Sequence, residues 1–201
     1  MAAPCRHPVT LRIATACIVH GEYVTDSVQP PPRHAVGAAY VAALAATLGF
    51  LPLHVIWALG IPLFADPDRF AAWHADGGGT YLLTLNLLAV LPAILALALV
   101  RPWGLRFPSW TPFWRDRPVP RLLLLIPGYG LVVVLGAYTV FAAFLAVQQR
   151  DAPDAIFDPW TGLIGIPHFI IWVTGLTIAT RSYDLRTRPS ADHATRSPAL
   201  P

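Results

Sequence analysis

The chain has 201 residues, of which 55% are hydrophobic and 12% are charged, with a mean hydropathy of +0.54 and a net charge of +3. Soluble domains carry about twice that share of charged residues, so the composition excludes an ordinary soluble domain and indicates a membrane protein. The two cysteines, Cys5 and Cys17, form no Cys-x-x-Cys pattern, which disfavours a thiol redox site.

Residues 1–34 form an N-terminal tail. Its apolar run, Val9–Val19, is interrupted by Arg12 and is too short to cross a bilayer. The next 30 residues, 35–64, carry no formal charge. A span needs about 20 apolar residues, so we expect the first membrane helix here, kinked at Pro52 because proline removes a backbone donor.

Three further apolar runs follow, separated by loops at 65–79, 101–121 and 148–158 and ended by a polar tail at 181–201. The sequence therefore predicts an all-α, transmembrane four-helix bundle, whose helices lie at about 35–62, 80–100, 122–147 and 159–180. Residues 35–180 make up this four-span unit.

The distribution of arginine predicts the orientation. Three arginines lie in 1–34, five in 101–121 and four in 181–201, against one each in 65–79 and 148–158. Cytoplasmic loops are enriched in basic residues, so both termini are expected in the cytoplasm of a cell (inner) membrane. The aromatic residues of the 101–121 loop suit the headgroup layer, and a loop tied to two spans offers no groove for nucleic acid.

Each predicted helix carries one notable polar side chain in its outer half, and a tryptophan follows each histidine on the same helix face. These candidate site residues are His54, Trp57, Asn86, Tyr138, His168 and Trp172. Polar groups in a span are energetically costly, and they mark either helix contacts or a functional site.

Three interpretations of this cluster are open. The polar groups can hydrogen-bond one another and fix the packing of the helices, which is a structural role. His54 and His168 can act as the axial ligands of haem b. Alternatively, they can serve as acid and base in a pocket for a lipid or an isoprenoid. Aspartates of the two outer loops are candidates to assist them: Asp66, Asp68, Asp76 and Asp158.

No metal site is indicated, because His74 in the first outer loop has no matched partner ligand. No hydrolase, zinc-protease or phosphate-binding motif is present either. We therefore expect a structural or accessory membrane component without catalysis and without a cofactor. Its expected partners are membrane lipids and, in addition, another membrane protein or a second copy of the chain.

Several short motifs resemble those of a known family. The stretch Leu53–Gly60 reads LHVIWALG, Leu99–Gly104 reads LVRPWG and Leu124–Gly130 reads LLIPGYG. Together with Pro108 and Trp110, these motifs resemble a family of small four-helix actinobacterial integral membrane proteins of unknown function. The resemblance implies the four-span fold and its topology, and it assigns no activity.

Overall fold

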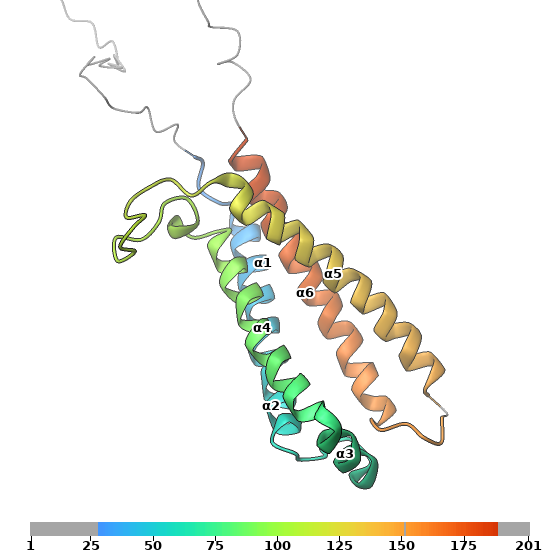
Figure 1. The fold of residues 1–201 in the computed structure, drawn as a ribbon. Coiled ribbons are helices and arrows are strands. Elements are labelled where there is room, and N and C mark those ends of the chain that lie inside the picture. The colour runs from blue at the N-terminus through green and yellow to red at the C-terminus, as the bar shows by residue number, and fades with distance from the viewer. Residues whose placement is uncertain (1–27, 151, 189–201) are drawn as a thin grey trace, which may run out of the picture.

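The computed structural model describes residues 28–150 and 152–188, and this part of the chain is all-α (Figure 1). Two isolated backbone bridges are its only extended pairings. Four helical units, 33–58, 67–98, 121–148 and 159–186, are long and apolar enough to cross a membrane. The α-helices are α1 (Arg33–Leu44), α2 (Leu51–Ala58), α3 (Pro67–Trp73), α4 (Gly79–Ala98), α5 (Arg121–Gln148) and α6 (Pro159–Arg186).

The first unit is α1 and α2 joined by a π-helical turn, Ala45–Gly49. Pro52 follows that turn and has no N–H to donate to the carbonyl four residues earlier. A π-helical turn beside a proline is a common way for a helix to accommodate the missing bond. Thr47 lies in this turn and donates its hydroxyl to the carbonyl of Ala43 at 2.8 Å.

The expected loop at 65–79 is mostly helical, which corrects the sequence prediction. Asp66 caps α3, Pro67 opens it, and a second π-helical turn, His74–Gly78, joins α3 to α4. Gly77 has a φ of 106°, a value that favours glycine and lies outside the helical region, so the glycine run forms a kink between two helices and does not end a loop. Figure 1 shows α3 set at an angle to α4.

α1 and α6 approach each other closely through small residues. One face of α1 consists of alanines that are buried against its neighbours: Ala35, Ala39, Ala42, Ala43. Gly175 of α6 faces this surface so closely that a Cβ there would lie 2.7 Å from the carbonyl oxygen of Ala38. Small residues permit such backbone approach, which is how helices associate within lipid.

We call the end of the molecule with residues 28–33 and 186–188 the termini end, and the opposite end the α3 end (Figure 1). α1 packs on both α4 and α6. Toward the α3 end, α2 packs on α4 while α5 follows α6, and the two pairs diverge in Figure 1. The loops at this end reconnect the pairs, because Asp66 N–H donates to Ile156 and Asp158 N–H donates to Phe64, both at 2.9 Å.

The fourth unit continues to Arg186, six residues beyond the expected end at 180. These residues have partners on other segments, which holds them in the helix. Tyr183 donates its hydroxyl to the carbonyl of Gly104 at 3.1 Å, and Arg186 donates to that of Leu99 at 2.8 Å. Asp184 forms ion pairs with Arg121 and with Arg188. The first part of the expected tail is therefore part of α6, and the rest, from 189, lies outside the described residues.

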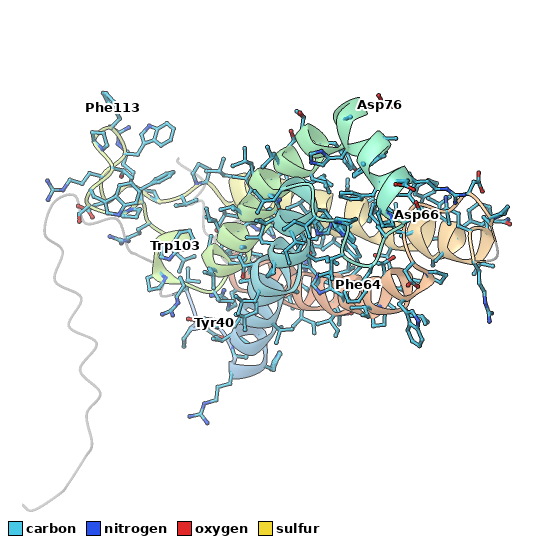
Figure 2. The ribbon with its side chains drawn as sticks, turned by 90° about the horizontal axis from the view of Figure 1, so that it is seen from below. Tyr40, Phe64, Asp66, Asp76, Trp103 and Phe113 are labelled. Atoms are coloured by element: carbon cyan, nitrogen blue, oxygen red, sulfur yellow. The ribbon has the colours of Figure 1, made fainter. Side chains whose placement is uncertain are left out.

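The loop at 101–121 folds back on itself. Phe107 N–H donates to the carbonyl of Arg117 at 3.0 Å, and Val119 N–H donates to that of Leu105 at 2.9 Å. Figures 1 and 2 show the loop projecting sideways from the helices, with Phe113 far from them. The side chain of Phe113 is 84% exposed, which suits a bilayer surface beside the helices.

We expect Gly175→Ala to destabilise the protein, because its new methyl group would meet the backbone of α1. Overpacking of this kind costs about 1–3 kcal/mol, which exceeds the gain of up to about 1 kcal/mol in helix propensity. The measurement is the free energy of unfolding during titration with a denaturing detergent. Gly37→Ala on α1 is the matched control, because a Cβ there meets nothing within 4 Å; equal effects of the two variants would contradict the close-contact explanation.

Candidate functional site

A pocket of about 460 Å³ lies between the two diverging helix pairs. Four of the six candidate residues line it: His54 and Trp57 from α2, Tyr138 from α5 and His168 from α6. α4 contributes a further wall with Tyr81, Leu82 and Leu85. Ligand pockets in proteins have about 300–1,000 Å³ and are mostly apolar with a few polar groups, and this pocket fits that description.

An aromatic cluster forms the end of the pocket that is nearer the termini. The ring of Phe50 stacks on the ring of His54 with 3.7 Å between centroids. It also packs edge-on against Phe169 at 6.3 Å and Trp172 at 5.9 Å. Tyr138 contacts the other side of Phe169, with 5.1 Å between ring centroids. The rings of Tyr138 and His54 thus both pack against this aromatic cluster.

The two imidazoles differ in their hydrogen bonds. His54 Nδ1 lies 2.9 Å from the carbonyl oxygen of Phe50. A carbonyl only accepts, so Nδ1 carries the hydrogen and the lone pair stays on Nε2. His168 packs against the backbone at Gly49, where a Cβ would lie 2.3 Å from the imidazole Cε1. Its Nε2 is enclosed and has no partner in the described residues. Glycine at position 49 is therefore what makes room for this ring.

The α3 end of the pocket is closed by a second aromatic group beneath the paired loops. Trp57 is 7% exposed and donates its indole N–H to the carbonyl of Leu63 at 2.7 Å. Its ring lies 4.7 Å from that of Phe157, which in turn packs edge-on against Trp73 at 5.6 Å. The fixed indole thus ties α2 to the loop that follows it.

The remaining two candidates, Asn86 and Trp172, are buried but do not line the pocket. Both amide atoms of Asn86 and the indole nitrogen of Trp172 lack partners in the described residues. Within 28–150 and 152–188, none of the six candidates hydrogen-bonds another; the bonds they make are to backbone carbonyls. Hydrogen bonds among these six side chains, one of the three interpretations of the cluster, are therefore not present in this part of the chain.

The acidic candidates have local roles at the α3 end. Asp66 accepts from Arg69 N–H at 3.0 Å, and Asp158 accepts from Trp160 N–H at 3.2 Å, so each caps a helix N-terminus. Asp68 lies in the first turn of α3, where negative charge is favoured, and Asp76 is exposed in the π-helical turn. None of the four lines the pocket beside the histidines.

His74 is half-buried and bonds through Nε2 to the carbonyl oxygen of Ala58 at 3.1 Å. That carbonyl belongs to the last turn of α2 and has no partner within its own helix. The histidine thus caps α2 from the π-helical turn. In the described residues, no group of three or more His, Cys, Asp or Glu side chains is placed to hold a metal ion.

The apolar residues of the pocket lining were not predicted from the sequence. Phe50 is four residues before His54, and this spacing puts both on one helix face. The spacing could therefore have indicated Phe50 as a neighbour of the His54 ring. Gly162 and Gly165 also line the pocket, and a Cβ at Gly165 would meet nothing within 4 Å. Phe157 gave no signal in the sequence, because it lies in a loop whose pairing with residues 64–66 is a tertiary contact.

Comparison of the chain with protein-family models, with curated proteins and with solved structures found no match in any of the three. The resemblance to the actinobacterial membrane family therefore rests on the short motifs alone.

We expect Asp66→Ala and Asp158→Ala each to lower the free energy of unfolding by about 1 kcal/mol, because each removes a helix cap. Asp68→Ala is the matched control and should cost only a few tenths of a kcal/mol, since Asp68 makes no capping bond. The measurement is again titration with a denaturing detergent. A loss for Asp68→Ala as large as that for Asp66→Ala would contradict the assignment.

Proposed function

We propose that this protein is a multi-pass membrane component, without catalysis of its own, that accommodates the apolar chain of a membrane lipid in the pocket. The observation that carries the proposal is the pocket itself, which lies in the outer half of the proposed spans and is walled by aromatic and aliphatic side chains. Tyr81 and Tyr138, on α4 and α5, line it while 54% and 45% exposed. In a bilayer, exposed side chains at this depth face lipid, so a chain can enter from the side.

The proposed setting is a transmembrane four-helix bundle in the cell membrane with both termini in the cytoplasm. Twelve of the fourteen arginines belong to the tails and to the 101–121 loop, which supports this orientation. Arg101, Arg121 and Arg186 bond to groups at the termini end. The exposed aromatic tip of the loop, with Trp110 and Phe113, suits the headgroup layer on the same side.

A binding role is favoured over catalysis because, in the described part of the chain, the pocket lining includes no carboxylate beside an imidazole. A carboxylate that pairs with a catalytic histidine stabilises the protonated ring during acid–base chemistry. His54 instead bonds a backbone carbonyl, and the nearby aspartates cap helices. A lipid-binding accessory protein needs only a cavity of fitting shape, and it is expected to act with a partner protein.

One observation favours a second candidate, a haem carrier. Histidines that bind a metal nearly always donate the other ring N–H to a backbone carbonyl or a carboxylate. His54 does so toward Phe50, which leaves Nε2 free to bind iron, and His168 lines the same pocket from another helix. Haem held between two such histidines would make the protein an electron carrier.

The lipid proposal is tested with Gly165→Leu, which fills the pocket from α6. Labelling of the purified protein in nanodiscs by a photoreactive lipid chain should fall at least about five-fold, because the new side chain occupies the ligand's space. Gly136→Leu on α5 is the matched control, since a Cβ there also meets nothing within 4 Å and the residue does not line the pocket. Equal labelling of the two variants at pocket residues would contradict the proposal.

The haem candidate is tested by the visible spectrum of the protein expressed with haem supplied, oxidised and then reduced with dithionite. We expect a flat spectrum, since a lipid chain competes for the same space. A Soret band that sharpens on reduction and disappears in His54→Leu would replace the lipid proposal with electron transfer.

A further inference from the structure

We infer that the pocket takes a neutral lipid, an isoprenoid or acyl chain that ends in a hydroxyl or carbonyl head, and that it excludes lipids with a phosphate head. This inference rests on the proposed lipid-binding function and specifies its ligand. It follows from the charge, the hydrogen-bonding groups and the depth of the pocket.

The charge of the pocket lining disfavours a phosphate head. Among residues 28–150 and 152–188, none that lines the pocket is Asp, Glu, Lys or Arg. A phosphate head inside a low-dielectric site needs a cationic partner, and arginine is the side chain that proteins use most for it. Two arginines of the termini end are bonded to other groups there, Arg121 to Asp184 and Arg186 to the carbonyl of Leu99. A charged head in this pocket would therefore be desolvated without compensation.

The hydrogen-bonding groups of the pocket fit a neutral head. The end of the pocket nearer the termini has the phenol of Tyr138 and the imidazoles of His54 and His168. In the described chain, the enclosed Nε2 of His168 has no partner, and the hydroxyl of Tyr138 belongs to a residue of the pocket lining that is 45% exposed. An unpaired buried group such as this Nε2 is costly, and a single hydroxyl or carbonyl can bond to it and to the phenol. A neutral polar head matches this set of donors and acceptors.

The depth and the shape of the pocket also favour a neutral head on an apolar chain. His54 lies four residues before the end of α2 at Ala58 and His168 lies nine residues after the start of α6 at Pro159, which is about 6 Å and about 14 Å along a helix. A charged group at that depth is unfavourable, while a neutral head reaches it at small cost. The walls between this polar end and the α3 end are aromatic rings and glycines, including Phe157, Gly162 and Gly165. They provide contact area for a hydrocarbon chain, and the further polar groups on the lining, those of Tyr81, Thr161 and Trp160, are neutral.

The test uses photoreactive probes in nanodiscs, in pairs with identical chains. Diacylglycerol is compared with phosphatidic acid, and an isoprenoid alcohol is compared with its monophosphate. We expect a neutral probe to label the pocket at least about ten-fold more than its phosphorylated partner. Preferential labelling by either neutral probe supports the inference and identifies the chain type.

Head recognition is tested with Tyr138→Phe, which removes one hydroxyl and keeps the ring. Loss of one hydrogen bond should lower labelling by the neutral probe about three- to ten-fold. Tyr129→Phe on the same helix is the matched control, because its hydroxyl bonds Asp184 outside the pocket. His168→Leu is a second variant, which replaces the imidazole with an apolar side chain of similar size and so tests the role of His168 in binding the head.

The outcomes separate this inference from the function on which it depends. Equal or stronger labelling by the phosphorylated probes, still blocked by Gly165→Leu, overturns the neutral-head inference and leaves the lipid pocket in place. Neutral labelling that neither Tyr138→Phe nor His168→Leu reduces overturns the assignment of the head to these residues. Labelling that Gly165→Leu does not block overturns both proposals.

Discussion

The contact between α1 and α6 is the constraint on which the rest of the structure depends. Helices in lipid gain nothing from the hydrophobic effect when they associate, so they rely on close van der Waals packing. Gly175 and the buried alanines of α1 bring two backbones together, and α4 and α5 are placed by packing against this pair. Arg186 and Tyr183 reinforce the arrangement at the termini end by bonding backbone carbonyls.

The pocket is a consequence of where the small residues stop. The buried alanines of α1 continue through Ala45 and Ala46 of the π-helical turn, and the next buried side chain toward the α3 end is the large ring of Phe50. Phe50 packs against Trp172, and beyond these rings the helix pairs no longer approach each other closely. The paired loops close the far end without filling the space between. A change from small to aromatic side chains along one interface thus separates a tightly packed half from a hollow half.

Much of the fold was predictable because it follows from hydropathy. The four apolar runs predict four spanning helices, and proline and glycine patterns predict irregularities within them. The sequence could not reveal α3, because a short helix with three aspartates nearby has the composition of a loop and is held by the burial of Phe70. The continuation of α6 past Thr180 was equally hidden, since its partners, such as Gly104 and Arg121, are distant in the chain.

The sequence pointed to residues of the pocket and not to their contacts. Counting residues from the expected helix ends gave His54, Tyr138 and His168 similar depths, and all three line the pocket. Whether they touch depends on the distance between helices, which no local pattern encodes. Asn86 shows this limit, because it lies near the same level and yet faces away from the cavity lining.

The junction of the two loops at the α3 end has a consequence for how such a chain can diverge. Asp66 and Asp158 join the opposite loop through backbone N–H groups, so these two bonds do not depend on side-chain identity, and a substitution there removes only a helix cap. The α1–α6 contact has no such freedom, because a single added methyl group at Gly175 meets a backbone oxygen. Distant relatives should therefore share the glycine and alanine spacing of α1 and α6 while their outer loops differ beyond recognition.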